Sequence, residues 1–144
     1  MNVRPFGALG ALAAALVAVV LASPVDAQGL GFEVVGDGIP KPLTATPGNA
    51  ARGKALLAKR EAANCLKCHS IKDKDLAGGG DKGPALDGIG ANLTTAQIRL
   101  SVVDLSRVTR KTEMPSFHKS GGEAPKLTAQ EVEDVVAYLG TLRR

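Results

Sequence analysis

The apolar positions near the end of the chain repeat with the period of an α-helix. They fall three and four residues apart, which places them on one face of a helix that follows residue 128: Val132, Val135, Val136 and Leu139. Polar residues fill the positions between them, and we expect these on the opposite face: Gln130, Glu133 and Asp134. The apolar stripe is interpreted as core packing rather than as a binding surface.

Two predicted helices begin with the same signal. Thr128 is followed three residues later by Glu131, and Thr94 is followed in the same way by Gln97. In a capping box the threonine hydroxyl accepts a backbone N–H, and the Glu or Gln side chain accepts one in return. We therefore predict one helix that begins after Thr128 and another that runs from Thr94 to about Asp104.

A third helix is predicted from residue 47 to about residue 63, a stretch rich in Ala, Leu, Lys, Arg and Glu. Gly53 lies inside it, where glycine costs about 1 kcal/mol relative to alanine. Such a glycine indicates that another backbone passes close by. No stretch shows the alternation of a strand, so the chain is predicted to be all-α.

The first residues are interpreted as a targeting segment. Arg4 precedes an apolar run over residues 8–21, and a stretch of small residues follows that run. This pattern predicts a signal peptide over residues 1–27 and export to the periplasm, with an uncleaved membrane anchor as the alternative. The Gly- and Pro-rich residues 28–46 predict an extended N-terminal arm, and residues 47–144 suffice for one small domain.

Composition and charge narrow the range of functions. The net charge of +4 is too moderate for dedicated nucleic-acid binding. Aromatic residues make up only 3% of the chain, so a domain of this size is expected to need an additional staple for its core. Four lysines lie within or shortly after residues 65–69 and would form a basic collar that steers an acidic partner, or else an ordinary solvated face: Lys67, Lys72, Lys74 and Lys82.

The strongest chemical signal is the pentapeptide Cys65-Leu66-Lys67-Cys68-His69. C-x-x-C-H is the attachment sequence of c-type haem. Two thiols within one helical turn can each add to a vinyl group on the same porphyrin edge. The histidine that follows then lies beneath the iron as an axial ligand. We predict one covalently bound haem c, attached at Cys65 and Cys68, with His69 as the proximal iron ligand.

A redox disulfide and half of a zinc site are the alternatives for this cysteine pair. A thioredoxin-like disulfide would require alternating strands and helices around it. A zinc site would require a second cysteine pair, whereas His118 is the only other histidine. With both cysteines attached to haem, the chain keeps no free thiol for substrate sulfur, so any covalent sulfur chemistry must lie on a partner.

Two further features concern the iron. A carbonyl in the backbone region of Pro84 is expected to accept the free ring N–H of His69. Met114 and His118 are the candidates for the second axial ligand. Pro115 favours an extended loop at Met114, and a thioether ligand raises the reduction potential. We therefore predict Met114 as the distal ligand and His118 as an exposed loop residue, which leaves no open iron site and favours electron transfer.

With these residues in place, residues 47–142 resemble the class I c-type cytochromes. The shared features are a first helix, C-x-x-C-H, a Gly-Pro loop, a Met-Pro loop and a closing helix with an aromatic residue. In that family the first and last helices cross at close contact, which would explain Gly53 and the position of Tyr138. The resemblance implies a small helical domain wrapped around one haem.

A narrower resemblance links the chain to the SoxX family, the monohaem subunits of the SoxAX cytochromes of periplasmic sulfur oxidation. It rests on residues 83–90, 99–104, 114–117 and 131–139, of which the Arg-Leu-x-Val-Val-Asp run at 99–104 discriminates best. The resemblance implies a heterodimer with a SoxA-like catalytic cytochrome, which joins thiosulfate oxidatively to a cysteine of a SoxYZ-like carrier. This chain would accept the electrons and would itself contribute no catalytic residue to the L-cysteine S-thiosulfotransferase.

Two other functions remain open at this stage. A free-standing, diffusible cytochrome c that serves an oxidase or reductase would need no enzyme partner. A haem enzyme with an open iron site would require that neither Met114 nor His118 binds the iron.

Overall fold

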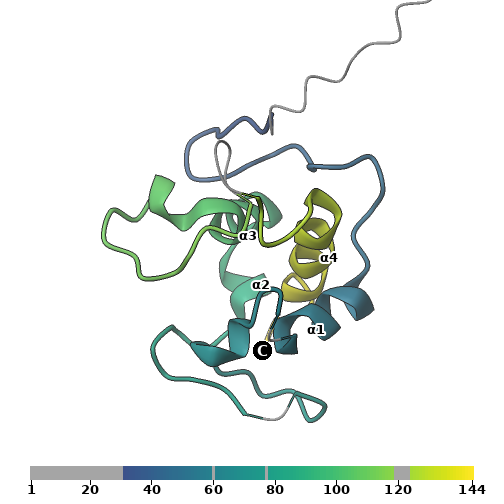
Figure 1. Cartoon of the computed structure of the whole chain (residues 1–144), viewed down its shortest axis with the longest axis vertical. Coiled ribbons are helices and arrows are strands. Elements are labelled where there is room, and N and C mark those ends of the chain that lie inside the picture. The colour runs from purple at the N-terminus through teal and green to yellow at the C-terminus, as the bar shows by residue number, and fades with distance from the viewer. Residues whose placement is uncertain (1–30, 60, 77, 119–123) are drawn as a thin grey trace, which may run out of the picture.

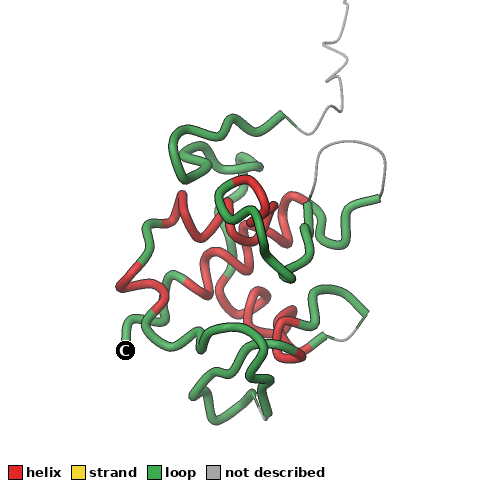
Figure 2. Tube along the Cα trace, turned by 90° about the vertical axis from the view of Figure 1, so that its left-hand side faces the viewer, coloured by secondary structure: helices red, strands yellow, loops and turns green. Residues whose placement is uncertain are grey.

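The structure is a computed structural model that describes residues 31–59, 61–76, 78–118 and 124–144. Its helices are short, and most of the described chain outside them is loop, although α3 runs directly into the 3₁₀ turn η2 (Figures 1 and 2). In chain order they are α1 (Ala50–Ala58), η1 (Cys65–Lys67), α2 (Ile89–Asn92), α3 (Thr95–Asp104), η2 (Leu105–Arg107) and α4 (Ala129–Leu139). The described residues contain no strand beyond an isolated bridge between Val35 and Gly38, and the predicted all-α class is confirmed.

The signal peptide predicted for residues 1–27 lies outside the described residues. Within the part of the chain that is described, no helix has both the length and the apolar character needed to cross a membrane.

Both predicted capping boxes are present. At the start of α3 the Thr94 hydroxyl accepts the Gln97 backbone N–H at 3.2 Å, and the Gln97 side chain accepts the Thr94 N–H at 2.8 Å. Thr128 and Glu131 form the same arrangement at the start of α4. The predicted helix starts are therefore confirmed, and the apolar stripe of α4 is buried in the core as expected.

Helix α1 is shorter than predicted. Asn49 caps its start by accepting the Arg52 backbone N–H at 2.9 Å, and the chain leaves the helix at Lys59, where the backbone is extended. The carbonyl of Lys59 then accepts the N–H of Asn64 at 3.1 Å. This turn redirects the chain into the cysteine segment, so the prediction of a continuous helix from residue 47 to residue 63 was wrong at both ends.

Gly53 marks the point where α1 crosses α4. A side chain at this position would collide with the backbone carbonyl of Asp134 and would lie 3.0 Å from Cβ of Tyr138. The close backbone approach that the glycine predicted is confirmed. The first and last of the described helices, α1 and α4, are thus packed against each other.

The polar face expected on α4 is buried at two positions. Glu133 forms a two-pronged ion pair with Arg99 of α3, at 2.7 and 2.9 Å, and both side chains are nearly inaccessible to solvent. Asp134 is paired in the same way with Arg52 of α1, at 2.6 and 2.8 Å. Our expectation that both carboxylates face away from the core was wrong, because arginines on neighbouring helices pair with them and allow their burial.

The described part of the N-terminal arm is extended and packs against helices of its own chain. Ile39 is fully buried, and its carbonyl accepts from Arg99 Nη1 at 2.7 Å. The backbone N–H of Leu43 donates to Glu133 at 2.9 Å. The arm runs along the outside of α4 before it reaches α1 (Figure 1). The buried Arg99–Glu133 pair therefore fastens the arm to α3 and α4.

Candidate functional site

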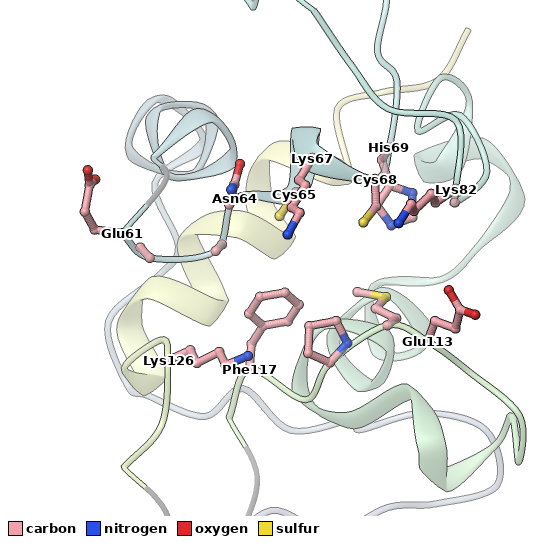
Figure 3. A pocket seen from close by; sticks show the side chains of 15 residues that line it. Glu61, Asn64, Cys65, Lys67, Cys68, His69, Lys82, Glu113, Phe117 and Lys126 are labelled. Atoms are coloured by element: carbon pink, nitrogen blue, oxygen red, sulfur yellow. The ribbon is translucent and has the colours of Figure 1, made fainter.

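A cavity of about 590 Å³ lies between the cysteine segment and the loop before α4. The cavity-facing side chains of Cys65, Cys68 and His69 form one wall, and the ring of Phe117 lies on the facing wall (Figure 3). Met114 and Pro115 also line the cavity. The structure thus brings the predicted attachment cysteines, the predicted proximal histidine and the predicted distal methionine to one space.

The cysteine wall is built by a tight turn. Asn64 adopts a left-handed conformation, with φ of 45°, and starts η1. The carbonyl of Cys65 then accepts the backbone N–H groups of Cys68 and His69, at 3.1 and 2.9 Å. This turn directs both thiols and the imidazole into the cavity (Figure 3). Burial raises the pKa of the Cys65 thiol to about 11.

The imidazole of His69 is oriented by the loop that follows it. Its Nδ1 lies 2.7 Å from the carbonyl oxygen of Pro84. Because a carbonyl can only accept, Nδ1 donates in this contact, and in a neutral ring the free lone pair is then on Nε2. The predicted contact with the Pro84 backbone is therefore present in the structure, while its part in holding an iron ligand stays a prediction.

Gly83 is a site residue that the sequence reasoning did not single out. A side chain at this position would collide with the His69 ring, with its Cβ only 2.7 Å from Nδ1. The Gly83 backbone N–H also donates to the carbonyl of Cys68 at 2.8 Å. The glycine lets the loop backbone lie flat against the imidazole, and its place directly before Pro84 was the only available signal.

The two candidates for the distal ligand lie in different environments. Met114 is half-buried and lines the cavity, and its N–H donates to the Thr112 hydroxyl at 3.1 Å. His118 is only 3% exposed, and its Nδ1 lies 2.8 Å from the carbonyl oxygen of Leu127. It is not among the described residues that line the cavity. The expectation that His118 is an exposed loop residue was wrong, because its ring packs inward against the start of α4.

The four lysines of the predicted collar are all exposed. Lys67 and Lys82 line the mouth of the cavity (Figure 3). Lys72 and Lys74 lie in the loop between them in sequence. Their role in steering an acidic partner stays a prediction.

A polar cluster fixes the loop that follows His69. Lys54 of α1 pairs with Asp73 and with Asp75, each at 2.8 Å. The hydroxyl of Tyr138, on α4, donates to Asp73 at 2.8 Å. The cluster connects the loop to both outer helices at their crossing. Burial, together with Asp73, raises the pKa of Tyr138 to about 12.

Acid is expected to weaken this cluster. Hydrogen bonds from Lys54, from the Asp75 backbone and from Tyr138 lower the pKa of Asp73 to about 2. The pKa of Asp73 is lower in the folded than in the unfolded chain, so its ionised carboxylate stabilises the fold above about pH 4. This stabilisation is lost as the pH falls toward 2. We expect Asp73→Asn to be less stable than the unsubstituted protein near neutral pH, with the difference narrowing in acid. Urea unfolding of the haem-loaded protein at a series of pH values measures this.

The matched control is Asp81→Asn, which removes an exposed carboxylate from the following loop without touching the cluster. It should follow the pH dependence of the unsubstituted protein. A stability difference for Asp73→Asn that stays constant from neutral pH down to about pH 2 would contradict the assignment.

The residues around the cavity fit a covalently held haem. Two free thiols, an imidazole whose Nδ1 is bonded to a backbone carbonyl, and a thioether line a space partly walled by an aromatic ring. Thiols in this spacing form thioether links to haem, and imidazole and thioether are its usual axial ligands in electron-transfer proteins. The fold and this cavity together are those of a c-type cytochrome.

Comparison with known proteins agrees with this class. A sequence model of the cytochrome c family matches residues 50–143, and the chain belongs to the cytochrome c family. It carries a covalently bound haem c, and Cys65 and Cys68 fit the attachment motif. The search of curated proteins found no match.

Among solved structures, the chain is similar to one in the crystal structure of SoxXA from P. pantotrophus. The two are 34% identical, the match covers 78% of this chain and 95% of the other, and the TM-score is 0.73. This likeness agrees with the resemblance to SoxX drawn from the sequence.

Two other cytochromes are more distant. Cytochrome c-550 from Paracoccus versutus is 19% identical, with coverage of 67% and 99% and a TM-score of 0.42. Cytochrome c2 from Paracoccus denitrificans is 22% identical, with coverage of 64% and 93% and a TM-score of 0.39.

Proposed function

We propose that this protein is the electron-accepting monohaem subunit of a SoxAX-type cytochrome in the periplasm. Residues 1–27 would serve as the signal peptide for export, and residues 47–144 would form the cytochrome domain. A SoxA-like partner would perform the oxidative joining of thiosulfate to a cysteine of a SoxYZ-like carrier. This chain would take up the electrons and pass them to a downstream acceptor.

One observation carries the proposal: the 34% identity over 95% of a chain of SoxXA. The run at residues 99–104, which distinguished the SoxX resemblance in the sequence, also supports it. Both ends of that run are buried and bonded, Arg99 to Glu133 and Asp104 to Ser116. These contacts lie between elements that build the cavity and the arm, so the run belongs to the architecture of the domain.

The residues of the cavity have separate roles in this proposal. Cys65 and Cys68 hold the haem through thioether links, His69 is the proximal ligand, and Met114 is the distal ligand. Pro84 accepts the ring proton of His69 and fixes its orientation. When bound, the haem supplies a one-electron redox centre whose potential a methionine ligand raises.

The electron balance fits a partner-dependent role. Formation of a bond between thiosulfate sulfur and a thiol sulfur releases two electrons and the thiol proton. Both cysteines of this chain are used for haem attachment, so the sulfur–sulfur bond must form on another protein. This chain accepts one electron at a time and therefore needs an onward acceptor between the two transfers.

Complex formation with a SoxA-like cytochrome tests the proposal. The mature haem-loaded protein would be mixed with the SoxA-like cytochrome of the same organism and studied by analytical ultracentrifugation. We expect a stable one-to-one heterodimer. A protein that stays monomeric with a competent partner, yet exchanges electrons with a terminal oxidase, would instead be a free-standing electron shuttle.

A further inference from the structure

Asp104 is a buried carboxylate at the end of α3. It is 1% exposed, and its closest cation is Arg107, whose Nε lies 3.3 Å away. Its other contacts are with hydroxyl groups and a backbone N–H. The Ser106 hydroxyl donates at 2.5 Å, the Ser106 backbone N–H at 3.3 Å and the Ser116 hydroxyl at 2.7 Å. Burial acts to raise the pKa of Asp104, but these hydrogen bonds outweigh it and the pKa lies below its ordinary value.

The two serines lie at opposite ends of one loop. Ser106 is in η2, directly after α3, and Ser116 comes two residues after Met114. A single oxygen of Asp104, Oδ1, accepts from both hydroxyl groups. The Asp104 carboxylate therefore connects the two ends of the loop over residues 106–116.

The end of this loop that carries Met114 is also bonded to the backbone of α3. The Phe117 backbone N–H donates to the carbonyl of Val103, in the residue before Asp104, at 3.1 Å. Pro115, between Met114 and Ser116, has a fixed φ. The end of α3 thus fixes the backbone just after Met114, whose side chain lines the cavity.

We propose that Asp104 is a positioning residue for the distal ligand: through Ser116 it holds the Met114 loop against the haem cavity and slows the loss of Met114 from the iron. The inference rests on the proposed ligation by Met114. A hydrogen bond to a charged, buried acceptor is stronger than one between neutral groups. Loss of the Ser116 hydroxyl frees the loop end and also leaves the buried carboxylate with one donor fewer.

Ser116→Ala tests the inference, with Ser106→Ala as its matched control. Both variants remove a hydroxyl bound to the same carboxylate oxygen, but only the first acts on the Met114 end of the loop. The readout is the rate at which imidazole displaces the distal ligand from the ferric haem, followed by loss of the sulfur-to-iron charge-transfer band. We expect displacement to be about tenfold faster in Ser116→Ala, from the strength of a hydrogen bond to a charged group.

Three further variants separate positioning from a general loss of stability. Ser116→Thr keeps the hydroxyl and should restore the displacement rate. In Asp104→Asn, the added substitution Ser116→Ala should have a smaller effect than it has alone, because the two residues act through one contact. Ser106→Ala is expected to lower the unfolding midpoint without a comparable change in the displacement rate.

Each outcome bears on the inference. Equal displacement rates in Ser116→Ala and Ser106→Ala would overturn it, as would a failure of Ser116→Thr to restore the rate. A ferric protein without a charge-transfer band would overturn it together with ligation by Met114. None of these three results would affect the heterodimer test, which measures partner binding alone.

Discussion

Replacement of Met114 by alanine is expected to abolish the sulfur-to-iron charge-transfer band and to lower the reduction potential by on the order of 0.1 V. A thioether ligand stabilises ferrous iron and so raises the reduction potential, which is why its loss is expected to lower that potential. Met114 lines the cavity that also contains the side chains of Cys68 and His69. Absorption spectra of the ferric protein and a potentiometric titration measure the two effects.

His118→Gln is the control for this prediction. The His118 ring is buried beside the carbonyl of Leu127, so the variant should keep the charge-transfer band while losing some stability. A Met114→Ala spectrum identical to that of the unsubstituted protein would contradict ligation by Met114. It would make His118 the distal ligand, which would require its ring to leave the position seen here.

Replacement of Glu133 by alanine is expected to destabilise the folded protein by about 3–5 kcal/mol. The substitution leaves Arg99 as an uncompensated charge among buried residues, because both side chains of the pair are nearly inaccessible. It also removes the acceptor of the Leu43 backbone N–H, which belongs to the N-terminal arm. Denaturant unfolding of the haem-loaded protein measures the loss, and hydrogen exchange at Leu43 reports the loosening of the arm.

A double variant distinguishes an unpaired charge from a general packing defect. Arg99→Met combined with Glu133→Leu replaces the pair by apolar side chains of similar size, and such replacements are often close to neutral. We expect it to recover most of the stability that Glu133→Ala loses. The Leu43 amide should still exchange faster, because its acceptor is absent in both proteins. A double variant as unstable as the single one would contradict this account of the pair.

Local sequence signals predicted those parts of the fold that are formed by neighbouring residues. Thr94 with Gln97, and Thr128 with Glu131, are three residues apart, so the capping boxes were readable without knowledge of the tertiary structure. Gly53 was informative for a different reason. A glycine inside a helix is unfavourable, and its presence predicted the helix crossing.

Features that depend on distant partners were missed. The sequence of α4 alone predicts an exposed face for Glu133 and Asp134. Their burial depends on arginines 34 and 82 residues away. The four residues of α2 are too few to display a helical period. His118 was predicted to be exposed because its contact with Leu127 joins residues nine apart and has no local sequence signal.

The site was predictable to the extent that it is local. Cys65, Cys68 and His69 form one contiguous motif. The hydrogen bond between Asp104 and Ser116 instead joins residues 12 apart and has no sequence signature. Gly83 stood beside a residue that was singled out, but its contact with the His69 ring required the path of the loop.

The central claim is that this chain accepts electrons from the joining of thiosulfate to a carrier cysteine. Stopped-flow reduction of its haem by thiosulfate tests this claim most directly, with the mature protein alone and together with its SoxA-like and SoxYZ-like partners. The mass of the carrier would be followed in parallel. We expect haem reduction only when both partners are present, with thiosulfate added to the carrier cysteine. If partners shown to be competent gave neither reduction nor an adduct, the claim would be contradicted, and a general electron shuttle would be the better description.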